Sequence, residues 1–157
     1  EMLRSLVGSE MCIRDRDTYS FGYSSAGFTD MPMNHKVFLA QFDAIKKLAS
    51  EGPCVMVGRC ADYALSEYKD CFSVFVHADT DWRINRLSQK HNKTAKEAKD
   101  MINKTDKSRS SYYNYYTNKK WGAAAGYSLS IDSSVLGIEG AAQAIINTIH
   151  IFDDLKK

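Results

Sequence analysis

Five charged residues, far apart in the sequence, have side chains suited to phosphate chemistry: Arg59, Arg83, Arg86, Asp106 and Arg109. A guanidinium group presents a planar fork of N–H donors that matches the oxygens of a phosphate. Arg83 and Arg86 are three positions apart, as are Asp106 and Arg109, so on a helix each pair shares one face. For either pair taken alone, ordinary surface ion pairing, worth less than about 1 kcal/mol, is the simpler interpretation. The prediction of an anion site therefore depends on their combination.

Arg59 is the most informative of the five because of the residues before it. It follows CVMVG, a short apolar run after Gly52-Pro53, whose length and valines predict a buried parallel strand over residues 54–59. Ligands of parallel sheets bind beyond the carboxyl ends of the strands, where an arginine can reach a phosphate. A structural salt bridge, for example to Asp62, is the alternative, and sequence position alone does not decide between the two.

The segment TDKSRSSYYNYYTNKKWG, residues 105–122, combines four tyrosines and a tryptophan with three lysines and one arginine. From Thr80 to Lys120 the chain has eleven Lys or Arg residues and four Asp or Glu residues, a local charge of +7 in a chain of net charge +2. This asymmetry suggests an anionic ligand held at one place. A solvated, lysine-rich helix is the simpler interpretation of the charge alone.

The elements that must position these residues alternate between helix and strand. Short apolar runs predict strands at 54–59, 72–78 and 127–132. Apolar spacing and capping residues predict helices at 36–51, from Asp81 with Thr80 as N-cap, from a capping box of Thr94 and Glu97 into the tyrosine segment, and from about Gly137. This order predicts an α/β fold, a three-layer parallel sheet with helices on both faces.

Composition narrows the class of protein. The 157 residues allow one domain, and 44% of them are hydrophobic, enough for a core. The longest apolar runs are far shorter than the roughly 20 residues of a membrane span, so we expect no membrane association. The four cysteines form no CxxC pair and no metal-ligand spacing. With no secretory pattern at the start, these features predict buried, reduced thiols and a cytoplasmic protein without a bound metal.

The first 35 residues differ from the rest. SLVGSEMCIRDR resembles the translation of a sequencing adapter, so we expect residues 1–16 to be foreign to the domain or disordered. Residues 17–35 have the composition of a loop, and the domain is predicted to span 36–157. GYSSAGFT fits the spacing of a phosphate-binding loop, but Phe28 stands where that loop needs lysine, and we interpret the match as chance.

Four segments together resemble the cytidylate kinase-like family, a branch of the P-loop nucleoside monophosphate kinases. They are CVMVGRCADYAL, FVHADTDWRINRL, INKTDKSRSSYYNYYTNKKWG and YSLSIDSSVLGIEGAAQAI, and the resemblance extends over residues 36–152. It implies a P-loop NTPase fold with a helical lid, here about residues 83–122. It also implies transfer of the ATP γ-phosphoryl group to a nucleoside monophosphate, with ATP and Mg²⁺ as cofactors of the intact parent protein.

The resemblance implies a role for each of the five residues. Arg59 would hold the phosphate of the acceptor, and Arg83 and Arg86 would contact the donor nucleotide. Arg109 would approach the transferring phosphoryl group, and Asp106 the sugar of the acceptor. Phosphoryl transfer requires positioning and charge stabilisation more than covalent chemistry, which arginines on a closing lid supply.

Three departures from the family pattern limit what the resemblance implies. Ile102 stands where classical cytidylate kinases have another arginine, and Cys60 stands where they have aspartate, so the choice of cytidine monophosphate is an expectation only. The glycine-rich phosphate loop and its strand are not found before Lys36. We therefore expect a fragment that is inactive alone. The alternatives are a basic, tyrosine-rich nucleic-acid binding module and a non-catalytic interaction domain.

Overall fold

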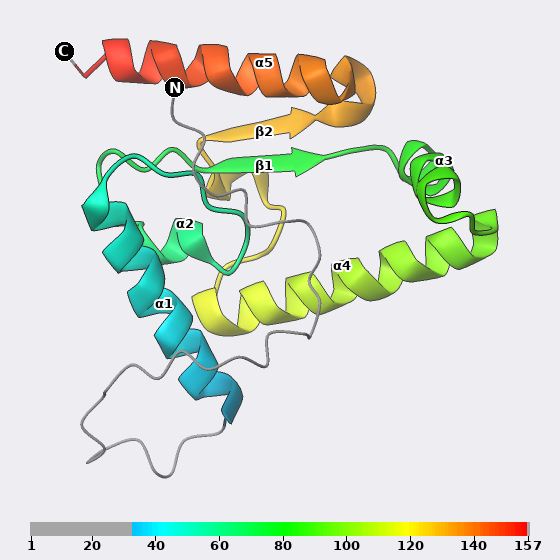
Figure 1. Cartoon of the computed structure of the whole chain (residues 1–157), viewed down its shortest axis with the longest axis horizontal. Helices are drawn as coiled ribbons and strands as arrows, with labels where there is room; N and C mark the ends of the chain where they lie inside the picture. Colours follow the sequence, from blue (N-terminus) through cyan, green and yellow to red (C-terminus); the bar gives the residue numbers. More distant parts are fainter. Residues whose placement is uncertain (1–32, 157) are drawn as a thin grey trace. The chain divides into compact units, whose positions relative to one another are not determined.

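The structure is a computed structural model that describes residues 33–156, and the expectations for residues 1–32 lie outside this range. The chain divides into two compact units, Glu1–Glu67 and Tyr68–Lys157. The described part of the first unit holds the helices α1 (Met33–Glu51) and α2 (Ala61–Ala64). The second unit holds β1 (Val74–His77), α3 (Thr80–His91), α4 (Ala95–Thr117), the 3₁₀ turn η1 (Ala124–Gly126), β2 (Leu129–Asp132) and α5 (Ser133–Asp154), as Figure 1 shows.

The first unit is built on the inner face of α1. Phe38 and Ile45 are buried on that face, as the apolar spacing predicts, and Phe42 packs on Tyr63 of α2 with 6.2 Å between the ring centroids. The helix begins at Met33 rather than at residue 36 and ends before Gly52. Val37 and Leu48, the residues that would widen the apolar face, are instead about half exposed. The buried stripe of α1 is thus narrower than its composition indicates.

The predicted strand over residues 54–59 is wrong. This stretch has no strand pairing in the structure, and the side chains of Val55 and Val57 are 71% and 63% exposed. A strand needs the backbone hydrogen bonds of a neighbour. The described residues of the chain supply none for this run, so an apolar sequence of strand composition remains an extended segment.

The sheet of the second unit consists of two parallel strands. β1 and β2 pair in register from Val74 with Leu129 to His77 with Asp132, so their carboxyl ends lie side by side. At the other end, the backbone N–H of Ser128 donates to the hydroxyl of Ser73, 3.0 Å away. The small parallel sheet agrees with the predicted fold class, whereas the wider three-layer P-loop arrangement stays a prediction.

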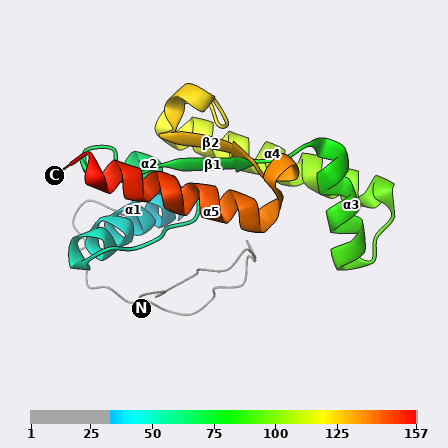
Figure 2. The same cartoon turned by 90° about the horizontal axis from the view of Figure 1, so that it is seen from above.

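Helices lie on both sides of these two strands. Figures 1 and 2 show the strands between α5 on one side and the C-terminal half of α4 on the other. The α5 residues turned inward repeat every three or four positions, and Ala141 is the most buried of them. Ile138 and Ala142, on the same helix, are exposed. Among the described helices, α5 alone has the length and apolar composition of a membrane span, but its inner stripe packs on β1 and β2.

Side-chain caps fix where the helices begin. The N-cap of α3 is Asp79, not Thr80, because its carboxylate accepts from the backbone N–H groups of Asp81 and Trp82 at 2.8 and 3.1 Å. Asp132 caps α5, which starts at Ser133, and Gly137 interrupts that helix with φ 69° and ψ 174°, a combination close to the glycine-only region. Two helical segments meet at Gly137, and the longer, C-terminal one begins there as the sequence predicts. The capping box of Thr94 and Glu97 is confirmed.

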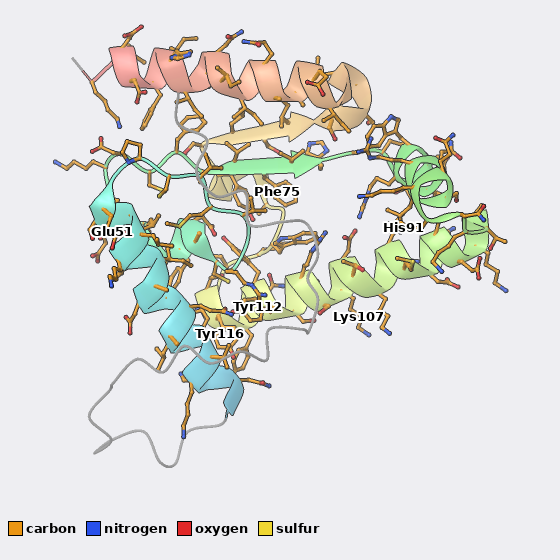
Figure 3. All side chains as sticks on the ribbon, in the orientation of Figure 1. Glu51, Phe75, His91, Lys107, Tyr112 and Tyr116 are labelled. Atoms are coloured by element: carbon orange, nitrogen blue, oxygen red, sulfur yellow. The ribbon has the colours of Figure 1, made fainter. Side chains whose placement is uncertain are left out.

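A cluster of aromatic rings joins α4 to the sheet. Phe75 of β1 stacks on Tyr127 with 5.0 Å between centroids and meets Trp121 edge to face at 5.4 Å. Tyr113 of α4 is buried and lies 6.4 Å from Tyr127. Figure 3 shows Phe75 on the side of β1 that faces α4. Gly122 passes close to this cluster with φ +75°, and a Cβ atom there would lie 3.2 Å from the Phe75 ring.

Gly122→Ala should therefore destabilise the second unit by about 1–3 kcal/mol, because alanine is strained in a left-handed backbone conformation and its Cβ atom would crowd the Phe75 ring. Unfolding by urea, followed by tryptophan fluorescence, measures the change. Gly126→Ala is the matched control in the same loop, since Gly126 has ordinary φ and open space around it. Equal stability of the two variants would contradict this account of the loop.

Thr94→Ala should lower the free energy of unfolding by about 0.5–2 kcal/mol at pH 7, because alanine lacks the hydroxyl that accepts from the Glu97 N–H and donates to the Glu97 carboxylate, whereas the backbone N–H of residue 94 still donates to that carboxylate. Hydrogen bonds from Thr94 lower the pKa of Glu97 from its usual 4.5. A lowered pKa gives stability above the unfolded-state pKa that disappears as pH falls below it. The difference between wild type and the variant should thus shrink as pH falls below 4.5, measured by urea unfolding. A stability difference between wild type and variant that stays constant with pH would show that ionisation of Glu97 does not contribute to it.

Candidate functional site

The helices α3 and α4 are joined by one ion pair. Both guanidinium Nη atoms of Arg83 donate to the carboxylate of Asp106, Nη1 to Oδ2 at 2.7 Å and Nη2 to Oδ1 at 2.9 Å. Arg83 lies one turn into α3, after the Asp79 cap, so its position follows from the end of β1. Beside this pair, Ile84 packs on Ala98 and Ile102 in a small apolar core. The geometry is bidentate, which fixes both side chains more firmly than a single contact does.

The other two arginines of α3 and α4, Arg86 and Arg109, are more exposed. Arg109 is one turn beyond Asp106 on α4, with Nη1 4.0 Å from Asp106 Oδ1, and its side chain is 49% exposed. The guanidinium of Arg86 lies over the ring of Trp82, 5.5 Å from its centroid. Arg83 is thus already matched by a carboxylate, whereas Arg86 and Arg109 retain donors that can face an anion. Two guanidinium groups share the Asp106 carboxylate and Arg86 is a third cation nearby along α3, an excess of positive charge that favours a negatively charged ligand.

These four charged residues line one cavity of about 390 Å³. Its walls come from the carboxyl end of β1, from α3, from α4 and from the loop after α4: Phe75, Val76, His77, Ala78, Trp82, Arg83, Arg86, Leu87, Ile102, Asp106, Arg109, Trp121 and Ser133. The structure therefore brings together Arg83, Arg86, Asp106 and Arg109. The cavity lies where parallel sheets bind ligands, beyond the strand ends.

The strand ends contribute a polar rim to this cavity. His77 ends β1 and Asp132 ends β2, with His77 Nδ1 3.8 Å from Asp132 Oδ2. The hydroxyl of Ser133 donates to the His77 carbonyl at 3.0 Å. Hydrogen bonds from Ser134 and then the nearby His77 lower the pKa of the Asp132 carboxyl, so Asp132 stays ionised near neutral pH. The two strands and the start of α5 are thereby tied at the cavity's edge.

Several cavity residues were not among the five candidates. The cavity is also lined by Phe75, Trp82, Trp121 and His77. In the sequence, these residues are distinguished only by their positions in or after an apolar run or near or inside the basic, aromatic segment. Contacts such as Phe75 with Trp121 join residues far apart along the chain, and no local pattern encodes them. The aromatic content of the 105–122 segment was the available signal.

Most tyrosines of that segment pack on protein. Tyr112 and Tyr116, one turn apart on α4, have ring centroids 4.8 Å apart, and both are labelled in Figure 3. Tyr113 is buried, whereas Tyr115 is 75% exposed. The rings therefore stabilise the C-terminal half of α4, and they do not form a row of exposed stacking surfaces.

Arg59 lies in the first unit, so its convergence on this cavity stays a prediction. Gly58, Arg59 and Cys60 all have left-handed backbones, with φ of 73°, 56° and 56°, in the turn before α2. Two non-glycine residues in this region make a strained turn that leaves Arg59 exposed. Among the described residues, no ion pair joins Arg59 to Asp62.

The cysteines are less uniformly buried than expected. Cys60 is 3% exposed, and burial, with a smaller effect of Asp62, raises the pKa of its thiol to about 11. This thiol stays protonated and inert at neutral pH. Cys54 is exposed and Cys71 is partly exposed, which corrects the expectation that both are buried.

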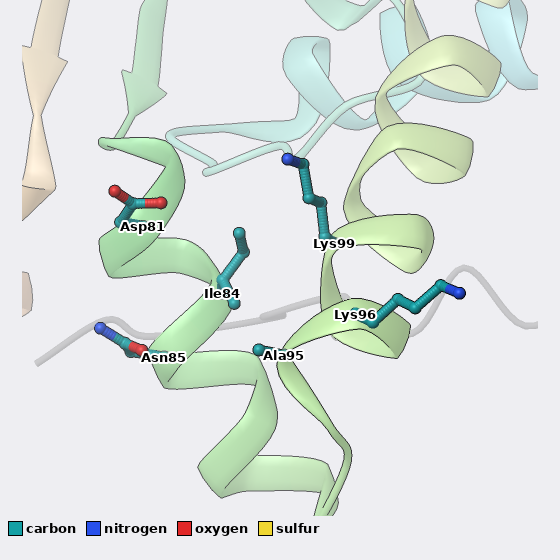
Figure 4. A pocket seen from close by; sticks show the side chains of 6 residues that line it. All are labelled: Asp81, Ile84, Asn85, Ala95, Lys96 and Lys99. Carbon is teal, nitrogen blue, oxygen red and sulfur yellow. The ribbon is translucent and has the colours of Figure 1, made fainter.

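A second hollow, of about 560 Å³, lies between α3 and the start of α4. Figure 4 shows its lining by Asp81, Ile84, Asn85, Ala95, Lys96 and Lys99. The end of the Lys96 side chain points away from the hollow in this view. Its charges are of both signs and no aromatic ring lines it, so it offers a nucleotide fewer partners than the first cavity.

No group of three or more His, Cys, Asp or Glu side chains in residues 33–156 could hold a metal ion. These residues therefore form no metal site from such a group of side chains, whereas magnesium that is bound to nucleotide phosphates needs only one or two carboxylates from the protein.

Comparisons with known proteins agree with the family resemblance found in the sequence. The profile of the cytidylate kinase-like family matches residues 2–135. The match includes residues 2–16, so the foreign origin of that stretch stays a prediction. A crystal structure of an uncharacterized protein from Eubacterium ventriosum ATCC 27560 is 31% identical, with a TM-score of 0.71 over 75% of this chain and 74% of that one. No curated protein matches the chain. The family match covers well over half of the sequence, and the chain belongs to the cytidylate kinase-like family.

Proposed function

We propose that this chain contributes the lid side of a nucleoside monophosphate kinase, which transfers the ATP γ-phosphoryl group to an acceptor such as cytidine monophosphate. The observation that carries the proposal is the arrangement of Arg83, Arg86, Asp106 and Arg109 around one cavity at the end of β1. Membership of a kinase-like family supports a nucleotide ligand, and the geometry supplies a place for its phosphates.

Each residue has a distinct part in the proposed mechanism. Asp106 holds Arg83 by two hydrogen bonds, which orients one guanidinium before any ligand arrives. Arg109 and Arg86, which are more exposed, contact the phosphoryl oxygens as α3 and α4 approach the ligand. Charge that spreads over those oxygens in the transition state is stabilised by donors already in place. We assign Arg59 to the phosphate of the acceptor, as the family resemblance implies.

The structure explains one departure from the family pattern. Ile102, which stands where classical cytidylate kinases have an arginine, is only 5% exposed and packs with Ile84 and Ala98. This position supplies apolar contact between α3 and α4 instead of a charge for the ligand. The proposed lid therefore offers the ligand one cationic contact fewer than in classical cytidylate kinases. We do not expect this position to select one nucleotide base over another.

A nucleic-acid binding module was the main alternative. That function needs a row of exposed rings along a basic surface. Tyr113 is buried and Tyr112 packs on Tyr116, so the observed α4 offers few such rings. The cavity favours a single nucleotide over a polynucleotide.

Arg109→Ala should weaken the binding of pyrophosphate by about 10- to 150-fold, since a hydrogen-bonded charged contact contributes about 1.5–3 kcal/mol. Isothermal titration calorimetry at low salt measures the affinity. Lys107→Ala is the matched control, because it removes an equal charge from the same turn of α4 outside the cavity. Equal losses in the two variants would show general charge attraction and no site.

The chain as it stands should bind nucleotides and yet show no turnover of CMP with ATP, because the sequence lacks a phosphate loop with its lysine. A coupled assay of ADP formation, with a complete nucleoside monophosphate kinase as positive control, measures this. CMP-dependent ADP formation by this chain would refute the expectation of inactivity but would not contradict the proposed binding site.

A further inference from the structure

Trp121 is held in one position by the residues around it. Its backbone N–H donates to Oδ1 of Asn114, 2.7 Å away, which ties the loop to α4. Its ring meets Phe75 at 88° with 5.4 Å between centroids. The next residue, Gly122, has φ +75° and lets the chain pass close to Phe75. A side chain fixed in this way binds a ligand with little further loss of conformational entropy.

Trp121 faces the same cavity as the arginines. It is half-buried and lines the cavity together with Arg83, Arg86 and Arg109. Trp82 also lines the cavity, but the guanidinium of Arg86 already lies over its ring. The perpendicular contact with Phe75 occupies at most one face of the Trp121 indole. Trp121 is thus the better placed of the two indoles for a flat ligand.

We propose that Trp121 is the stacking surface for the base of a nucleotide whose phosphate groups bind at Arg86 and Arg109, beside the ion pair of Arg83 with Asp106. The inference rests on the proposed function, because it requires phosphates in that cavity. A nucleotide combines a flat ring with phosphates, and the cavity combines an indole with guanidinium groups. ATP and CMP both have this chemistry, and separate titrations decide which of them stacks.

Stacking has a consequence for specificity. Every base has a π face, so a stacking contact adds affinity without reading hydrogen-bonding groups at the base edge. This agrees with the apolar role of Ile102, which leaves the lid without one charged contact of classical cytidylate kinases. Trp121 should therefore determine how tightly a nucleotide binds and have little influence on which pyrimidine it carries.

The test uses the two tryptophans of the chain as reporters. In the full-length W82F protein, Trp121 is the sole tryptophan, and in W121F it is Trp82. Titration of W82F with ATP or with CMP should quench emission in a saturable way, whereas W121F should respond less. Pyrophosphate, which has no base, is titrated by calorimetry as the probe of the arginines alone.

Affinity measurements then separate the contribution of the Trp121 ring from that of the arginines. Trp121→Ala should weaken binding of the quenching nucleotide by about 5- to 150-fold and leave pyrophosphate affinity within about twofold. W121F keeps a flat ring and should retain most of the nucleotide affinity. Trp121→Leu, which preserves apolar volume without an indole, replaces Trp121→Ala if circular dichroism shows that the alanine variant is unfolded.

The outcomes distinguish the two proposals. Pyrophosphate binding that persists, with nucleotide affinity unchanged in Trp121→Ala or Trp121→Leu, overturns the stacking role and leaves the phosphate site standing. Equal loss of nucleotide and pyrophosphate affinity also overturns it, because the substitution then acts on the cavity as a whole. Failure of ATP, CMP and pyrophosphate to bind the unaltered chain overturns the proposed function and this inference with it.

Discussion

The bidentate contact between Arg83 and Asp106 is the interaction on which the cavity depends. It joins α3 to α4 at the point where both helices reach the strand ends, and it holds the carboxylate between two arginines. Without Asp106, the guanidinium groups of Arg83 and Arg109 would face one another with no opposite charge between them. The apolar contact of Ile84, Ala98 and Ile102 brings the helices together, and the bidentate ion pair adds a directional contact between them.

Residues near one another in sequence were the most predictable part of the site. The three-residue spacing of Arg83 with Arg86 and of Asp106 with Arg109 placed each pair on one helix, and the capping box located the start of α4. The N-cap of α3 was missed by one residue, because Asp79 and Thr80 are both good capping residues and only the geometry after β1 selects between them.

Features that depend on contacts between residues far apart in the sequence were harder to predict. The apolar run over residues 54–59 has strand composition, yet composition cannot specify the neighbour that a strand requires, and Val55 and Val57 are exposed. The aromatic cluster of Phe75, Trp121 and Tyr127 is likewise a product of three separate segments. Of the five candidates, the sequence could place together the four on α3 and α4, since they share two adjoining helices, whereas Arg59 belongs to another unit.

The pairing of β1 with β2 has a consequence for handling the protein in solution. Within the described residues these strands pair only with each other, so each presents an outer row of backbone N–H and C=O groups. Such rows accept strands from other molecules, and Val76 adds an exposed apolar side chain. Concentrated preparations should therefore be prone to intermolecular β-pairing, and dilution or a short peptide complementary to the outer edge of β1 should keep the chains apart.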